Sequence, residues 1–342
     1  MSTDEVERAL KLIAVQECGD PPIEIDVGSQ VFAMAFSANG EYILSGGEGV
    51  RVWRVKDGTQ VARMEAMWVR CLAVSKDGRR IVAGARWGEV FVWDAKTYEQ
   101  VFKSEKNCYE INKVDFSPDS SRLVTASDNR TASIWDMPTR KRVQTLYHDN
   151  WVRAAKFSPQ GDRIATATPD SIRVWDSKDG RLLVDIKVGV TPLFDTGLLW
   201  SNDHLFVISD GKIKQINAST GSVVSQWPLP ESDHYSCIAL PKHGEFVAYT
   251  TERTVTFWDT SSHIQLGHVQ HPQDIRSTVL SPDDEFIAIG GERGNIIVRR
   301  FSRIIVSVFV SLDYGVCERL SRPNHSIPLT PGTIHSDKRR CT

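Results

Sequence analysis

The chain has 342 residues, of which 25% are charged and 41% hydrophobic, and its formal net charge is -2. This composition is typical of a globular protein with one large or two medium domains. Because the charge is nearly balanced, we expect no direct binding of nucleic acid. The 6 cysteines form no CxxC pair, which argues against a zinc site or a disulfide framework and favours a reducing compartment.

The N-terminal segment predicts a short amphipathic helix over residues 3–16. Val6, Leu10 and Ile13 recur at helical spacing, and Thr3 precedes an acidic first turn as an N-cap would. The segment lacks the apolar core of a signal peptide, and the longest apolar run, residues 304–310, is too short to cross a membrane. We therefore expect a cytoplasmic, or else nuclear, protein without membrane contact.

One stretch, residues 148–186, shows the pattern on which most of the chain is built. Apolar residues alternate with polar ones in three short runs, which are separated by Ser158-Pro159-Gln160-Gly161 and Pro169-Asp170-Ser171. A fourth run follows, over residues 181–186. Period-two alternation interrupted by Pro, Gly and Asp predicts four short antiparallel strands.

Two landmarks repeat along the chain with a period of about 41 residues. The first is an apolar residue followed by a Ser-containing turn, as in Phe116-Ser117-Pro118-Asp119. The second is a strand ending in Trp-Asp, and its Trp position falls at Trp53, Trp93, Trp135, Trp175, Ile216, Trp258 and Arg299. Both series give seven units in phase, with units five and seven irregular because they lack the Trp.

This period and signature resemble those of WD40 repeats, and the resemblance covers residues 22–310. It implies an all-β fold, a seven-bladed β-propeller of four-stranded antiparallel blades. Such rings usually close by pairing strands from both chain ends, and we expect Pro22–Val27 to be that closing strand, with Ile304–Val310 as a competitor. The predicted domains are an N-terminal helical extension (1–21), the propeller (22–310) and a disordered C-terminal tail (311–342).

The resemblance also implies a hydrogen-bonded set of four side chains that holds a blade together. It consists of a His before the inner strand, a Ser or Thr on the second strand, an Asp in the following turn, and the Trp. Unit four matches with His148, Thr166, Asp170 and Trp175. Buried polar groups are tolerated where they satisfy one another, so we expect a structural rather than a catalytic role for this set.

Positions flanking the first apolar residue of each inner strand line the channel mouth in this family, where partner peptides commonly dock. Together with residues ahead of the turn Asp, they give the candidate partner-binding residues Trp68, Arg70, Arg86, Glu110, Asn112, Asp128, Trp151, Arg153, Asp274 and Arg276. Trp and Arg dominate interface hot spots, which favours a partner with acidic segments. Alternatively, the two Trp pack between blades and the arginines pair with nearby carboxylates, including Glu292.

The sequence contains none of the motifs GxSxG, HExxH or GxxxxGK[ST]. Its one histidine cluster, His263, His268 and His271 with Asp274 nearby, has no standard metal-ligand spacing. The leading hypothesis is a non-enzymatic scaffold or adaptor, monomeric within a multiprotein complex and without cofactor or metal. The alternative is a propeller enzyme of the metal-dependent hydrolase type, acting at the channel mouth.

Overall fold

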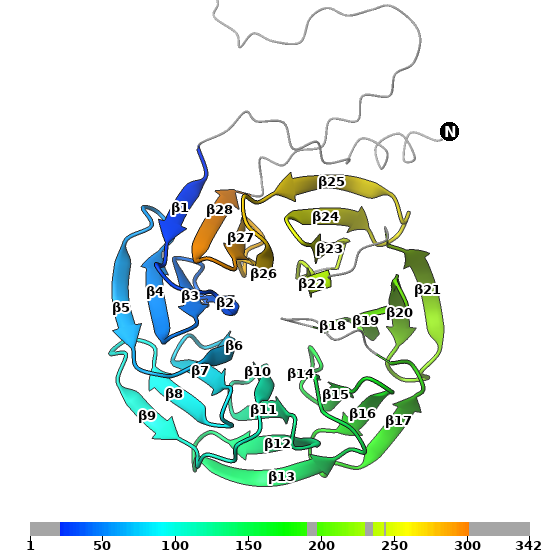
Figure 1. Cartoon of the computed structure of the whole chain (residues 1–342). Helices are drawn as coiled ribbons and strands as arrows, with labels where there is room; N and C mark the ends of the chain where they lie inside the picture. Colours follow the sequence, from blue (N-terminus) through cyan, green and yellow to red (C-terminus); the bar gives the residue numbers. More distant parts are fainter. Residues whose placement is uncertain (1–20, 190–196, 230–234, 243, 301–342) are drawn as a thin grey trace, which may run out of the picture. The chain divides into compact units, whose positions relative to one another are not determined.

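A computed structural model describes residues 21–189, 197–229, 235–242 and 244–300, all of which belong to one compact unit. These residues form seven four-stranded antiparallel sheets, the blades of a propeller, and the predicted fold class is confirmed (Figure 1). None of the described segments forms a helix that could span a lipid bilayer. The predicted helix over residues 3–16, the competing strand Ile304–Val310 and the predicted disordered tail lie outside the described residues.

The first four blades follow one another along the chain, each with its strands in sequence order. Their bounds are β2 (Ala33–Phe36), β3 (Tyr42–Gly46), β4 (Val50–Arg54) and β5 (Gln60–Met64) in blade one; β6 (Val69–Val74), β7 (Arg80–Ala85), β8 (Val90–Asp94) and β9 (Gln100–Lys103) in blade two; β10 (Ile111–Phe116), β11 (Arg122–Ser127), β12 (Thr131–Asp136) and β13 (Lys141–Tyr147) in blade three; β14 (Ala154–Phe157), β15 (Arg163–Ala167), β16 (Ile172–Asp176) and β17 (Leu182–Ile186) in blade four. The four strands predicted within residues 148–186 are thus confirmed.

Blades five to seven complete the ring. Their bounds are β18 (Leu198–Ser201), β19 (His204–Ser209), β20 (Lys212–Asn217) and β21 (Val223–Pro228) in blade five; β22 (Tyr235–Ala239), β23 (Phe246–Thr251), β24 (Thr254–Asp259) and β25 (Gln265–Gln270) in blade six; β26 (Ile275–Leu280), β27 (Phe286–Gly291), β28 (Asn295–Arg300) and β1 (Ile23–Asp26) in blade seven. Blade five, which the sequence aligned poorly, has all four strands, and Ile216 is fully buried where other blades carry Trp.

Burial of the strands follows their place in the blade. The second and third strands pack against neighbouring blades on both faces, and β8 is accordingly buried at four successive positions, Val90 to Trp93. The outermost strands pack on one side only, so β5, β17 and β21 bury chiefly one residue near their end. Because each blade buries its faces against two others, no blade has a core of its own.

The ring closes in blade seven, where strands from distant parts of the chain pair. β1 is the outermost strand of that blade and pairs antiparallel with β28, so that Ile25 lies opposite Ile296. The Val27 N–H donates to Gly294 O at 2.8 Å, which extends the pairing. Inner strands of consecutive blades are neighbours all the way round, including β26 beside β2. The prediction that Pro22–Val27 closes the propeller is therefore confirmed.

Candidate functional site

The candidate residues lie at one end of the blades, which we call the channel rim. It carries the turns between second and third strands and the connections that enter each inner strand; Figure 1 shows the inner strands around the centre. Backbone hydrogen bonds hold these two kinds of loop together within a blade. The Arg86 N–H donates to Trp68 O at 3.0 Å in blade two, and the Asp128 N–H donates to Glu110 O at 3.0 Å in blade three. The rim therefore presents its side chains from paired, fixed loops.

Three of the predicted arginines form ion pairs on the rim. Arg70 reaches Glu110 of the next blade at 2.6 Å, and Arg153 reaches Asp128 of the preceding blade at 3.3 Å. Arg276 pairs with Glu292 at 3.0 Å within blade seven. These are the pairings that the alternative interpretation of the arginines required. The Arg70 and Arg153 pairs cross blade boundaries and are only partly exposed, so they help to hold neighbouring blades in register.

Two more predicted residues, Asn112 and Asp274, also have partners on the rim. The Asn112 amide donates to Asp128 Oδ1 at 2.7 Å and to the Val152 carbonyl at 2.9 Å, which ties blade three to blade four. Asp274 accepts a hydrogen bond from Arg253 at 2.8 Å, and this bond holds the Asp274 pKa below its ordinary value. Both side chains are thus engaged within the protein.

Arg86 differs from Arg70, Arg153 and Arg276 because aromatic rings, and no carboxylate of the described residues, lie against its guanidinium. It lies 5.9 Å from the ring centroid of Trp68 and 5.6 Å from that of Trp87. Within the part of the chain that the structure describes, Arg86 has no carboxylate partner. The planar cation is thus positioned by two indole rings, while its hydrogen-bonding edges stay available to a ligand.

The surroundings of Arg86 are apolar and exposed. Trp68 is 37% exposed, Trp87 43%, Tyr109 54% and Met67 67%. The Cys108 N–H donates to Trp87 O at 3.0 Å, which brings the loop that carries Tyr109 beside Trp87. We call Met67, Trp68, Arg86, Trp87 and Tyr109 the rim cluster.

The sequence analysis selected Trp68 and Arg86 but missed the other three members of the rim cluster. Met67, Trp87 and Tyr109 lie in loops, where no periodic pattern marks them. The sequence did contain one signal for Trp87. It lies six positions before Trp93, and the equivalent position in unit three, six before Trp135, is the turn residue Asn129.

Trp151, the predicted anchor of blade four, is 47% exposed, and Arg153 lies 4.9 Å from its ring centroid. The loop that carries Trp151 is held by Asn150, whose amide donates to Asp170 Oδ2 at 2.7 Å. Asp170 thus supports the rim loop from the neighbouring turn of the same blade. This contact replaces the one with His148 that the repeat pattern implied.

The four-residue set predicted in blade four is brought together only in part. Trp175 Nε1–H donates to Thr166 Oγ1 at 2.8 Å, and the His148 ring meets the Trp175 ring edge-on at 5.4 Å. Neither His148 nitrogen has a hydrogen-bond partner among the described residues, and Asp170 is exposed. The reason lies in the turn: Thr166 precedes Trp175 by 9 residues, whereas Thr125 precedes Trp135 by 10. The shorter turn leaves Asp170 outside the blade.

Replacing Thr166 by valine tests the half of the set that is formed. Valine keeps the shape of threonine but leaves the Trp175 N–H buried without an acceptor, so we expect a loss of about 1–3 kcal/mol in unfolding free energy. Urea denaturation followed by tryptophan fluorescence measures it. Thr145→Val on β13, a partly exposed site, is the control and should change stability by less than about 0.5 kcal/mol. Equal stability of the wild type and Thr166→Val would show that the bond contributes nothing.

The histidine cluster behind the enzyme alternative is dispersed in the structure. The His263 ring stacks on Trp227 at 4.4 Å, and His271 is buried with its Nδ1 3.0 Å from the Gln273 carbonyl. His268 lies on β25, opposite Thr256. Among the described residues, no group of three His, Cys, Asp or Glu side chains is arranged to hold a metal ion. The geometry thus offers no support for a metal centre built from these histidines.

These features define a propeller of the WD40 type, and the comparison with protein families agrees. Residues 58–94, 97–136 and 140–176 match the family model described as "WD domain, G-beta repeat". Three segments of the chain are thus WD40 repeats, and the resemblance stated from its sequence is confirmed. Each matched segment spans the outer strand of one blade and three strands of the next, for instance β5 to β8. The sequence repeat is therefore offset from the blade by one strand.

Relatives with curated descriptions are similar over part of their length. WD repeat-containing protein 1 of Rattus norvegicus is 31% identical over 58% of this chain and 36% of its own length. Apoptotic protease-activating factor 1 of Danio rerio is 25% identical over 65% of this chain and 18% of its own. Protein groucho of Drosophila melanogaster is 23% identical over 77% of this chain and 38% of its own. The chain thus spans well under half of these relatives.

Proposed function

We propose that this protein is a non-enzymatic interaction scaffold that holds a partner protein or peptide on the rim cluster of blades two and three. The observation that carries the proposal is Arg86, an exposed cation placed between Trp68 and Trp87 without a carboxylate partner among the described residues. An aromatic and arginine cluster of this kind combines large apolar area with directed charge, as interface hot spots do.

The partner chemistry follows from the charges that remain unpaired. Arg70 and Arg153 are neutralised by their own carboxylates, so they offer less to a ligand than Arg86 does. Lys106 adds a second cation, 5.2 Å from the ring centroid of Trp87. We therefore infer a partner segment with an acidic side chain for Arg86 and an apolar side chain beside Trp68. Such a segment binds a rigid, preformed site and pays little reorganisation energy on the scaffold side.

The test is quantitative affinity purification with a Trp68→Ala/Arg86→Ala double variant. We expect recovery of the main partner to fall by at least about tenfold, because removal of one hot-spot residue typically costs 1–2 kcal/mol or more. The melting temperature should stay within a few degrees of the wild type, because both side chains are exposed. The control, Arg142→Ala/Val143→Ala on β13, removes an exposed arginine and an exposed apolar side chain far from the rim cluster and should retain the partner.

A second double variant, Trp151→Ala/Arg153→Ala, separates binding from blade registration. Arg153 pairs with Asp128 across a blade boundary, so its loss should lower stability as well as any binding at blade four. Unchanged partner recovery by both double variants would refute a docking site on the rim. The enzyme alternative is tested separately, by metal analysis and by an esterase and phosphatase panel on His268→Ala and His271→Ala proteins.

A further inference from the structure

At the end of the blades opposite the rim, a turn that begins with a serine joins the first strand to the second. The backbone N–H of this serine donates a hydrogen bond to the carbonyl of a residue at the start of the second strand, and the side chain of that residue differs between blades. These residues are Tyr42 in blade one, Arg80 in blade two, Arg122 in blade three, Arg163 in blade four and Phe286 in blade seven. Because the backbone bond is the same in each case, the side chains start from equivalent places.

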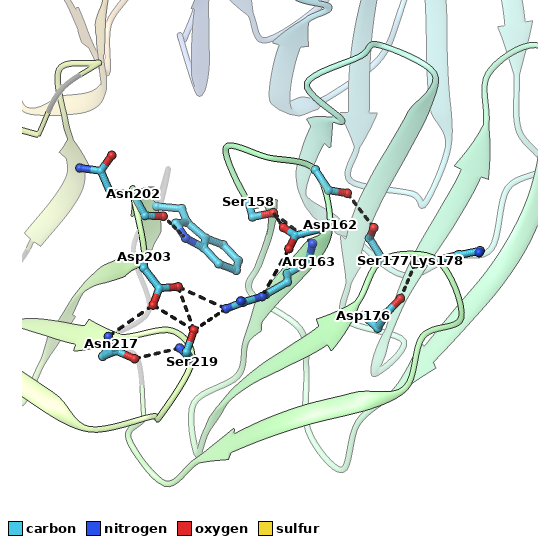
Figure 2. A network of polar contacts seen from close by, with 12 residues as sticks. Ser158, Asp162, Arg163, Asp176, Ser177, Lys178, Asn202, Asp203, Asn217 and Ser219 are labelled. Atoms are coloured by element: carbon cyan, nitrogen blue, oxygen red, sulfur yellow. Dashed lines mark hydrogen bonds and ion pairs between the residues drawn. The ribbon is translucent and has the colours of Figure 1, made fainter.

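In blades two to four this position sends an arginine into the next blade. Arg80 Nη1–H donates to the Ser120 carbonyl at 3.4 Å, and Arg122 Nη2–H donates to Ser177 Oγ at 3.2 Å. Arg163 donates to Asp203 at 3.2 Å and to Ser219 at 2.7 Å, as Figure 2 shows. Each arginine therefore spans the space between two blades.

Blade one has no such arginine, and a hollow of about 350 Å³ opens between blades one and two. Tyr42 and Tyr98 line it from the two blades, over a floor that includes Leu44, Val52 and Ile81. Burial and the nearby Tyr42 both raise the pKa of Tyr98, as expected for two phenol rings that share one partly buried space. At the bridged junction of blades four and five the hollow is about 270 Å³ and has Arg163 in its wall.

Two further residues keep the hollow open because they are small. Ala38 stands in the first turn where blade three has Pro118, and it faces Gly78 of blade two. Ala95 is the equivalent of Met137 in blade three. In both blades the backbone N–H of this residue donates to the carbonyl of the residue that directly precedes the second strand. At positions 38, 42 and 95 the chain thus departs from the repeat, and each of these three departures leaves space in the same hollow.

Two lysines and the carboxylate of Asp77 lie at the mouth of the hollow. Lys76 lines the hollow, and Lys96 lies on the turn between the lining residues Ala95 and Tyr98. Neither lysine has an ion pair among the residues described, whereas the Asp77 carboxylate already accepts from Ser75 Oγ at 2.6 Å and from the Arg79 amide at 3.0 Å. The two lysines, set against the single carboxylate of Asp77, would attract an incoming acidic group.

We propose that this hollow is a second docking site, which takes one aliphatic or aromatic side chain from a short acidic segment of a partner protein. The volume fits one such side chain with part of its backbone, and it lies in the size range of ligand pockets. The apolar floor would receive the anchor side chain, and Lys76 would pair with a neighbouring carboxylate. The site is separate from the rim cluster, because first turns and rim loops lie at opposite ends of the strands.

The chain itself supplies the variants that test this proposal. Tyr42→Arg copies blades two to four and should span the hollow, and Ala95→Met copies blade three and should fill its wall. Because both residues already occur at the equivalent places, both variants should fold, which urea denaturation checks. The probe is a displayed library of random twelve-residue peptides selected on the wild-type protein. Enriched peptides are synthesised, and their dissociation constants are measured by fluorescence anisotropy.

We expect enriched peptides that carry Leu, Ile, Met or Phe within two residues of Asp or Glu. Tyr42→Arg and Ala95→Met should each weaken their binding at least about tenfold, and Lys76→Glu should weaken it several-fold. Trp68→Ala/Arg86→Ala should leave it unchanged, which separates this site from the rim. The proposal is overturned if selection yields no peptide that is sensitive to Tyr42→Arg, or if every enriched peptide loses binding only in the rim variant.

Discussion

Replacing Ile25 by aspartate in β1 is expected to destabilise the propeller by at least about 4 kcal/mol. Ile25 is 3% exposed and packs in a cluster that joins blade seven to blade one through Val31, Trp53 and Ile296. Aspartate removes these contacts and places a charge where nothing pairs with it. The effect should exceed that of most core substitutions, because this single strand closes the ring.

The measurement is urea denaturation followed by circular dichroism. Glu24→Ala is the matched control: Glu24 neighbours Ile25 on the same strand but is exposed, so the free energy of unfolding should change by less than about 0.5 kcal/mol. Hydrogen exchange adds a local readout, since the Val27 amide is bonded to Gly294 only while the strand is docked. If Ile25→Asp and Glu24→Ala unfold at the same urea concentration, closure by β1 contributes no stability.

Acidification is expected to destabilise the wild type more than a His148→Phe variant, by about 2 kcal/mol between about pH 7.5 and about pH 5. His148 is 8% exposed, and within the part of the chain that the structure describes neither ring nitrogen has a hydrogen-bond partner. Burial, followed by the charge of Arg173, lowers its pKa to about 4, although Asp149 and Asp185 act in the opposite direction. The neutral ring is therefore strongly favoured in the folded protein.

The sign follows from proton binding. Between the ordinary histidine pKa of 6.5 and the folded value of about 4, the unfolded chain holds a proton that the folded chain lacks. Stability is thus complete above about pH 6.5 and is lost as the pH falls toward about 4. Phenylalanine cannot titrate and keeps the edge contact with Trp175, so it should match or exceed wild-type stability at neutral pH.

Urea midpoints at both pH values for wild type, His148→Phe and His148→Asn supply the comparison. The asparagine variant also lacks the titration but keeps a polar group, so it separates loss of the proton from gain of apolar packing. Both variants should show the shallower pH dependence. A pH slope of the wild type that persists in both would mean that other groups, such as His271, account for it.

Much of the fold could be predicted from the sequence because a propeller repeats its chemistry. Trp93, Trp135 and Trp175 recur at the same point of each blade, so their spacing predicts the number of blades and the place of the closing strand. Even the ion pair between Arg70 and Glu110 lies at a separation of 40 residues, one blade along the chain. Contacts with the period of the fold are visible in a single sequence.

Features that break the period were not predictable in this way. The turn before Trp175 has one residue fewer than its counterpart in blade three, so the motif match placed Asp170 inside a blade from which the structure excludes it. Trp87 and Tyr109 lie in loops, where neither alternation nor spacing applies. The hollow beside Tyr42 is recognised only in the structure, where the equivalent arginines of blades two to four reach into the next blade. Both proposed binding sites thus arise where the chain departs from its own repeat.

The pairing of β1 with β28 has a consequence for protein engineering. Ile23 lies directly opposite Val298, so the N-terminal edge of the propeller and its C-terminal edge leave the same blade side by side. A short linker between them would make the ring continuous, and new termini opened in an exposed turn, such as the one near Gly221, would yield a circular permutant with every blade intact. Which blade comes first thus depends only on where the chain begins, because the packing between blades is continuous around the ring.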